Sequence, residues 1–249
     1  MVITSRKLEQ ELGINSVIAN YFANERKVPD NNLFWKNKRI YISSGFGFLT
    51  IPMIFDLVHK CGVSLDLLLQ DEHVSLMEQG FHLLKLYENE EISFENFLVG
   101  CKTLLKDKIK QPKLAADLFA VFAGKQASFF TFETKHKALA RSDSFLFTLV
   151  DIDLTDEWIN QFLPYWYSLA RPILLLDDFK DLPEDRLSGD ENTIIELGND
   201  AAAIEAAYNM GMSDLELLAT INPQLATFMR RFLNEALRYS YIKTELLKA

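Results

Sequence analysis

The chain is poor in the residues that mark several common classes of site. It has two cysteines, Cys61 and Cys101, which lie far apart and form no Cys-x-x-Cys motif, so we expect two buried thiols in a reducing cytoplasm. It has four histidines, which form neither a His-Glu-x-x-His motif nor a pair of Glu-x-x-His motifs. This excludes the sequence signatures of zinc proteases and di-iron bundles, and the histidines are expected at surface or capped positions.

Long apolar runs and excess positive charge are also missing. No run approaches eighteen consecutive apolar residues, so no transmembrane segment is predicted. Charged residues at Arg6, Lys7, Glu9 and Glu11 interrupt the apolar stretch that a signal peptide would need. The net charge of −9 argues against a nucleic-acid surface, which normally presents clustered Lys and Arg.

Glycine and proline are scarce, at 10 and 7 of 249 residues, and the motifs built on glycine are incomplete. Gly45 and Gly47 lack the third glycine of a dinucleotide loop, and neither Gly-Lys-Ser/Thr nor Gly-x-Ser-x-Gly occurs. With few breaks and mostly helical apolar spacing, the sequence predicts an all-α fold, a single-domain helical bundle over residues 1–249 with an irregular segment at about 24–50.

The predicted helices follow the apolar spacing, and residues 39–48 are the one stretch that could form a short strand or a hydrophobic loop. Ser93 and Thr155 are expected N-caps. The predicted ranges are Ile3–Phe22, Ile51–Lys60, Leu65–Glu88, Phe94–Lys110, Lys113–Phe122, Gln126–Arg141, Thr155–Asp181, Asn192–Met210, Leu215–Ala219 and Pro223–Lys248.

What the sequence does contain is a run of acids after an apolar helix. Five carboxylates fall within residues 177–185, directly after the apolar stretch 162–176. On a helix, Asp177 and Asp181 lie one turn apart on one face with Asp178 at its edge, and like charges at this spacing cost ~0.2–0.5 kcal/mol per pair unless a cation intervenes. Hard oxygen ligands suit Mg²⁺ bound with a substrate's phosphate oxygens. The alternative is a solvated acidic face near a helix end.

Two prolines bracket this acidic segment. Pro172 either kinks the long helix or begins a new one, and Pro183 is expected to end or bend the helix soon after Asp181. The argument that carboxylates share one helical face therefore covers Asp177 to Asp181 and does not extend to Glu184 and Asp185.

At these residues the chain resembles the class I isoprenoid synthases, an all-helical family that includes prenyltransferases and squalene synthases. Over about thirty residues the pattern is similar to their second aspartate-rich motif: a small residue, Ala170, then the three aspartates, then Glu184-Asp185 and Gly189. The resemblance implies that Asp177 and Asp181 bind Mg²⁺, which bridges an isoprenoid diphosphate. It also implies that Asp178, Glu184 and Asp185 are further ligands or groups that support the ligands. The resemblance does not identify a catalytic residue, and a homodimer is one possible oligomeric state.

The family's first aspartate-rich motif is degenerate here. The nearest match is residues 67–78, in which Asp71 and Glu72 follow three leucines and Ser75 stands where a third carboxylate is expected. The resemblance implies that Asp71 and Glu72 face the Asp177 cluster as metal ligands. The alternative is that both are simply exposed on an amphipathic helix.

Basic groups are expected beside a metal-bound diphosphate, because such an anion is also held by charge-assisted hydrogen bonds. Arg238-Tyr239 in addition resembles an Arg-Tyr pair that some terpene synthases use at the diphosphate. The expected substrate-binding residues are Arg171, Lys180, Arg186, Arg238 and Tyr239. The resulting hypothesis is a Mg²⁺-dependent isoprenoid diphosphate-binding protein, similar to prenyltransferases or terpene synthases. The alternative is a noncatalytic helical scaffold for a ligand or a protein that has lost the first metal motif.

Overall fold

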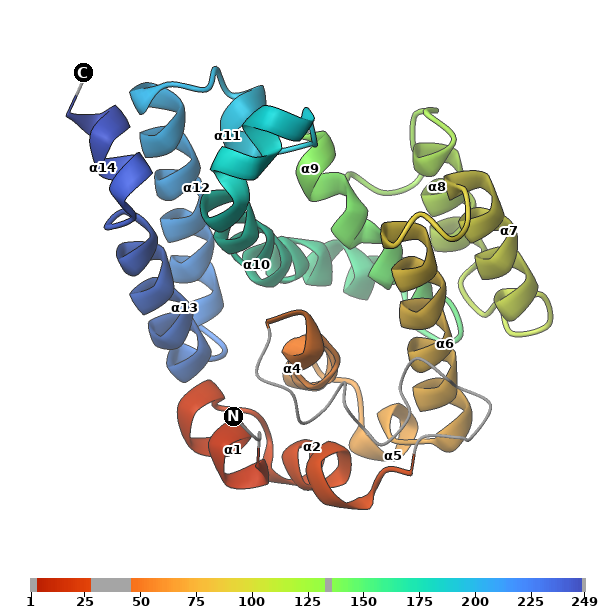
Figure 1. The fold of residues 1–249 in the computed structure, drawn as a ribbon. Helices are drawn as coiled ribbons and strands as arrows, with labels where there is room; N and C mark the ends of the chain where they lie inside the picture. Colours follow the sequence, from red (N-terminus) through yellow and green to blue (C-terminus); the bar gives the residue numbers. More distant parts are fainter. Residues whose placement is uncertain (1–3, 28–45, 133–135, 248–249) are drawn as a thin grey trace. The chain divides into compact units, whose positions relative to one another are not determined.

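The computed structural model describes residues 4–27, 46–132 and 136–247, and all regular elements in these ranges are helices. The predicted all-α class is thereby confirmed (Figure 1). Of the expected strand or loop at 39–48, residues 39–45 lie outside the described ranges, and residues 46–48 begin helix α4. Within the described ranges, no helix is both long and apolar enough to cross a membrane.

The chain divides into two compact units whose segments alternate along the sequence. The first comprises Met1–Glu9, Ile14–Phe132 and Asp143–Phe162, and the second comprises Gln10–Gly13, Glu133–Ser142 and Leu163–Ala249. Each unit is described by itself below. The single domain expected from the sequence stays a prediction.

The first unit is built mostly from short and medium helices, among which α6 and α7 pack against each other. Its core includes the fully buried rings of Phe22, Phe55 and Phe97. Its elements are α1 (Ser5–Leu12, shared with the second unit), α2 (Ser16–Asn20), the π-helix η1 (Tyr21–Glu25), α4 (Phe46–Lys60), α5 (Leu65–Leu68), α6 (Asp71–Glu88), α7 (Phe94–Leu105), α8 (Pro112–Phe122) and most of the 3-10 helix η3 (Arg141–Leu149).

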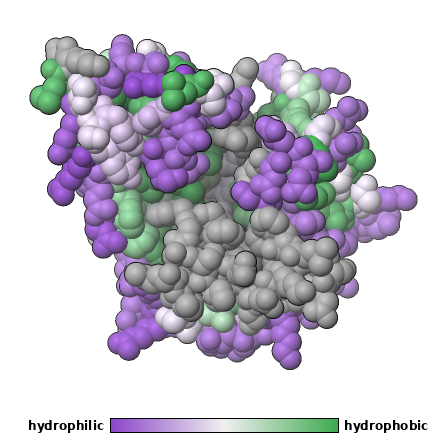
Figure 2. Space-filling model, viewed as in Figure 1, coloured by the Kyte–Doolittle hydropathy of each residue, from purple (hydrophilic) through white to green (hydrophobic). Residues whose placement is uncertain are grey.

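The second unit contains the longest helix and the C-terminal helices, of which α12 and α13 lie side by side (Figure 1). Trp166, Tyr167 and Phe179 on the long helix are fully buried. Figure 2 shows hydrophilic side chains over much of the face in view, including that of this unit. Its elements are α9 (Lys137–Ala140), most of α10 (Asp156–Ser188), α11 (Thr193–Glu196), α12 (Ala201–Ala219), α13 (Pro223–Ala236) and α14 (Ser240–Leu246).

Both N-caps predicted from the sequence are confirmed, since the Ser93 and Thr155 hydroxyls accept backbone N–H groups at 3.2 and 3.1 Å. The predicted helix Ile3–Phe22 is instead broken at Gly13, whose φ of 62° ends α1. Glycine is required here because an added Cβ would lie 2.4 Å from Asn222 Oδ1. The Asn222 amide in turn donates to the Leu12 carbonyl at 3.0 Å, which satisfies one of the carbonyls left open at the helix end.

Other predicted helices fail where a long-range contact or a turn intervenes. Residues 126–132 of the predicted helix Gln126–Arg141 are not helical, because backbone N–H groups of residues 128–130 donate to Asp117 instead. The predicted helix Asn192–Met210 is interrupted at Gly198-Asn199, both of which have positive φ. The predicted short helix Leu215–Ala219 is not separate, because these residues form the C-terminal part of α12.

Helix α10 is longer than the sequence indicated. It runs to Ser188 and contains Pro164, Pro172 and Pro183 within its length. Pro183 therefore does not end the helix soon after Asp181, and the alternative that it bends the helix stays a prediction. As a result Glu184 and Asp185, which the sequence left without a defined position, share the helix of Asp177 and Asp181.

Candidate functional site

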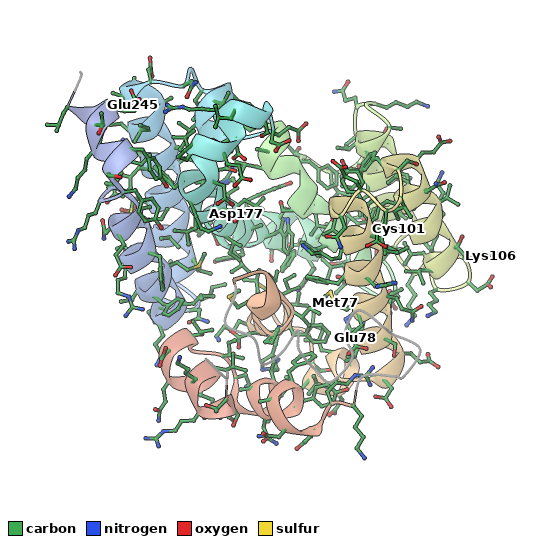
Figure 3. The ribbon with its side chains drawn as sticks, in the orientation of Figure 1. Met77, Glu78, Cys101, Lys106, Asp177 and Glu245 are labelled. Carbon is green, nitrogen blue, oxygen red and sulfur yellow. The ribbon has the colours of Figure 1, made fainter. Side chains whose placement is uncertain are left out.

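The acidic segment of α10 separates into two groups because the helix is continuous through Pro183. Positions 177, 181 and 184 lie on one side of the helix, and positions 178 and 185 lie on the adjacent side. We call the first three the outer acidic group (Asp177, Asp181, Glu184) and the other two the inner acidic group (Asp178, Asp185). Figure 3 labels Asp177, whose side chain is 73% exposed.

The inner acidic group holds the chain that follows α10. The Asp178 carboxylate, 7% exposed, accepts the backbone N–H of Thr193 at 3.0 Å. The buried Asn192 amide donates to the Asp178 carbonyl and to the Asp185 carboxylate, both at 2.8 Å. Asp178 is thus bonded within the protein and anchors the start of α11, and its role as a metal ligand stays a prediction.

The outer acidic group faces solvent and has a lysine between its members. Lys180 Nζ lies 2.8 Å from Asp181 Oδ1 and 4.0 Å from Asp177 Oδ1. The hydrogen bond to Asp181 is the main reason that the Lys180 pKa is raised. Lys180 therefore supplies part of the neutralising charge that the sequence required, although such exposed pairs contribute little to stability.

The second acidic segment, at the start of α6, is bonded to an arginine that the sequence did not single out. Arg26 donates from Nη1 to Asp71 at 2.9 Å and makes two further bonds to Glu78, at 2.9 and 2.7 Å. Asp71 is 86% exposed and Glu72 is exposed, whereas Glu78, labelled in Figure 3, is buried. That Asp71 and Glu72 face Asp177 stays a prediction, because the two segments belong to different units.

Two of the basic residues predicted to bind substrate are engaged within the second unit. Arg171 forms a bidentate pair with Asp214 at 2.9 and 2.5 Å. Arg186 donates to the Asn199 side chain at 2.7 Å and lies 3.4 Å from Glu245. Each would have to leave these partners to reach a diphosphate.

The remaining predicted substrate-binding residues are on the surface. Arg238 and Tyr239 are exposed in the turn between α13 and α14, and Lys180 is 64% exposed. These three therefore meet the first requirement for contact with a ligand from solvent.

A metal ion would find a limited set of ligands. Among residues 4–27, 46–132 and 136–247, no three His, Cys, Asp or Glu side chains are grouped as a complete metal site. Mg²⁺ commonly binds through one or two carboxylates together with phosphate oxygens and waters. Asp177 and Asp181, one turn apart and accessible, fit that kind of site, and they do not fit a metal centre made of protein ligands alone.

The first unit contains a separate apolar pocket between α6, α7 and η3, with about 370 Å³ of empty space including its open part. The lining includes Cys101 (labelled in Figure 3), and burial raises the pKa of its thiol to about 12, so the thiol is neutral and unreactive at neutral pH. The residues around the pocket are Leu76, Gly80, Phe81, Phe97, Cys101, Leu104, Leu105, Ser144, Phe145, Phe147 and Thr148.

Replacing Gly80 with alanine is expected to raise the free energy of unfolding by ~0.5–1 kcal/mol, because glycine inside a helix costs conformational entropy. Among the described residues, and apart from the glycine's own turn of helix, no heavy atom lies within 4 Å of a Cβ added at Gly80, so we expect no steric cost to offset this gain. Gly100→Ala in α7 is the matched control, since its Cβ would meet Leu83 Cδ1 at 2.8 Å. Urea denaturation measures the stability of both variants, and an equal gain in the two would show that the contact with Leu83 at position 100 has no steric cost.

His73 was expected at a surface or capped position, and of these two alternatives the surface position is wrong. Its ring is buried on α6 and its Nδ1 lies 2.9 Å from Asp151 Oδ1. The sequence gives no local signal for this pair, whose members are 78 residues apart.

Comparison with known proteins does not assign a function to any residue of this site. No family model, no curated protein and no solved structure matches the chain. The function is therefore argued from the arrangement of the residues themselves.

Proposed function

We propose that this protein binds an isoprenoid diphosphate through Mg²⁺ at the outer acidic group of α10. The observation that carries the proposal is the continuity of α10 past Pro183, which brings Asp177, Asp181 and Glu184 to one solvent-facing side of the helix. The resemblance of residues 170–189 to the second aspartate-rich motif of isoprenoid synthases supports the choice of ligand.

Asp177 and Asp181 would hold the metal, and a bound Mg²⁺ would neutralise charge on the diphosphate oxygens. Lys180, between them in sequence, would turn from Asp181 toward the anion, where its ammonium group would donate hydrogen bonds to the diphosphate oxygens. The exposed Arg238 and Tyr239 are the further candidates for contact with the diphosphate. The proposal is one of binding, because no residue of the chain is assigned to bond breaking.

A second candidate is the noncatalytic scaffold, and the bonding of Arg26 favours it. In the family that the chain resembles, metal ions are held from two acidic motifs, whereas here Asp71 and Glu78 of the degenerate motif are both bonded to Arg26. An arginine cannot lose its charge at physiological pH, so these carboxylates are neutralised without a metal.

Calorimetry with a farnesyl thiodiphosphate, an unreactive analogue, tests the first proposal. We expect binding that requires Mg²⁺ and that weakens by more than about tenfold in Asp177→Asn/Asp181→Asn, because the variant lacks both proposed ligands. The matched control is Glu205→Gln/Glu216→Gln, which removes two exposed carboxylates from α12 of the same unit and should bind as the wild type does.

Two results would contradict this proposal. Binding that is equal in the two double variants would place the ligand elsewhere. An absence of heat for the wild type, with and without Mg²⁺, would instead favour the noncatalytic scaffold.

A further inference from the structure

We propose that Tyr241 is a positioning residue for the outer acidic group, because its hydroxyl replaces the backbone hydrogen bond that Pro183 cannot make. The hydrogen bond itself is independent of ligand, and the effect on binding rests on the proposed function. The consequence is that a residue of the C-terminal helix α14 keeps Asp181 and Glu184 in register on α10.

The starting point is the missing donor at Pro183. In an α-helix each N–H donates to the carbonyl four residues earlier, so a residue at position 183 would serve the carbonyl of Phe179. Proline has no N–H, and its ring also crowds that carbonyl, which usually kinks or ends a helix. Yet α10 continues for five residues beyond Pro183.

Tyr241 fills this gap from outside the helix. Its Oη lies 2.8 Å from the carbonyl oxygen of Phe179 and 2.9 Å from that of Lys180. A hydroxyl has a single hydrogen, so the two carbonyls share one donor. The carbonyl that Pro183 leaves without its helical donor is therefore one of the two that receive the Tyr241 hydroxyl.

The position of Tyr241 is itself fixed by α14. Ile242, the next residue, is fully buried and anchors the helix. Glu245, one turn after Tyr241 and labelled in Figure 3, lies 3.4 Å from Arg186 of α10. Helix α14 thus contacts α10 on both sides of Pro183, at residues 179–180 and at residue 186.

Tyr241 also remains a donor over the whole range of physiological pH. Burial, followed by the nearby Tyr239 and Asp181, raises the pKa of its hydroxyl to about 12. The hydrogen that bridges to α10 is consequently retained at neutral pH.

The bond matters for the site because Pro183 lies inside the outer acidic group, between Asp181 and Glu184. If the helix broke at Pro183, Glu184 would leave the face that Asp177 and Asp181 share. The outer acidic group would then lose its C-terminal carboxylate.

A double-mutant cycle of Tyr241→Phe and Pro183→Ala tests the proposal with two readouts, amide hydrogen exchange over residues 184–188 and the dissociation constant for farnesyl thiodiphosphate with Mg²⁺. We expect Tyr241→Phe alone to speed exchange by about fivefold and to weaken binding, because the Phe179 carbonyl loses its donor. In the Pro183→Ala background, whose restored N–H serves that carbonyl, Tyr241→Phe should change neither readout.

Tyr208→Phe is the matched control, because its hydroxyl bonds to Asn234, away from α10, at 2.8 Å. Equal effects of Tyr241→Phe with and without Pro183 would overturn the proposal, and so would faster exchange with an unchanged dissociation constant. If the wild type binds no analogue, the proposed function and the positioning role fail, whereas the exchange cycle still decides whether Tyr241 replaces the bond lost at Pro183.

Discussion

Replacing Arg26 with methionine is expected to lower the free energy of unfolding by ~3–5 kcal/mol, the range observed when one partner of a buried ion pair is removed. The partner left behind is Glu78, whose exposed fraction is 1%. A carboxylate in that position cannot recover its hydration when the two hydrogen bonds from Arg26 are lost.

The geometry explains why most of this effect comes from Glu78 and little from Asp71. Arg26 Nε and Nη2 donate to the two Glu78 oxygens at 2.9 and 2.7 Å, which is the bidentate arrangement that arginine favours. Asp71 is 86% exposed, and a pair with so exposed a partner contributes ~0–1 kcal/mol. We therefore expect Asp71→Asn to cost less than ~1 kcal/mol.

Urea denaturation followed by circular dichroism measures these changes. Lys27→Met is the matched control, because it removes the same charge from the exposed neighbouring position. The double variant Arg26→Met/Glu78→Met should recover most of the loss, since replacing a buried pair by apolar side chains is often neutral. A loss for Arg26→Met no larger than that for Lys27→Met would show that the pair contributes little.

Much of the helical content could be predicted from the sequence because apolar spacing and N-caps are local signals. Ser93 and Thr155 could be identified as caps from the residues that follow them within a single turn. The breaks could not be placed in the same way. The break at Gly13 fits against Asn222, which is more than 200 residues away in the sequence.

In the candidate site, too, features set by a single helix turn could be predicted, and features set by contacts between distant residues could not. The i,i+4 relation of Asp177 and Asp181 is a property of one helix turn and was predicted without knowledge of the fold. Arg26 is 52 residues from Glu78, and no local pattern links the two. The different roles of Asp178 and Asp177, which are adjacent in sequence, depend on Asn192 and Thr193 contacting one side of α10.

Pro183 shows how a correct local rule gave the wrong boundary. Proline removes a helical hydrogen bond, and the sequence alone offers no replacement donor within reach. The donor lies on another helix, at Tyr241, 62 residues from the Phe179 carbonyl that it bonds. A proline in a helix is therefore tolerated where tertiary structure supplies the missing hydrogen bond.

The second large effect is expected at Asp117, where Asp117→Asn should lower the free energy of unfolding by ~3 kcal/mol or more. The carboxylate is 2% exposed and accepts three backbone N–H groups, from Ser128 at 2.7 Å, Phe129 at 2.7 Å and Phe130 at 2.8 Å. Hydrogen bonds to a charged group contribute ~1.5–3 kcal/mol each, and the N–H of Phe130, which is buried, would find no water in exchange.

Asparagine is the informative substitution because it keeps the shape of the side chain and replaces one acceptor oxygen by an NH₂ donor. Both carboxylate oxygens of Asp117 are in use, Oδ1 by Ser128 and Oδ2 by Phe129 and Phe130. Either orientation of the amide therefore sets an NH₂ group against at least one backbone N–H, donor against donor.

The loss should appear both in urea denaturation and as faster amide exchange at residues 128–130, because the carboxylate holds that segment against α8. Asp107→Asn removes the same charge at an exposed position after α7 and should change stability by no more than ~0.5 kcal/mol. Phe130 is 6% exposed, so release of the segment also exposes apolar surface. The fall in the free energy of unfolding and the rise in the exchange rate should therefore occur in the same variant. Unchanged exchange at residues 128–130 in Asp117→Asn would mean that the segment is held by the packing of Phe130 and not by the carboxylate.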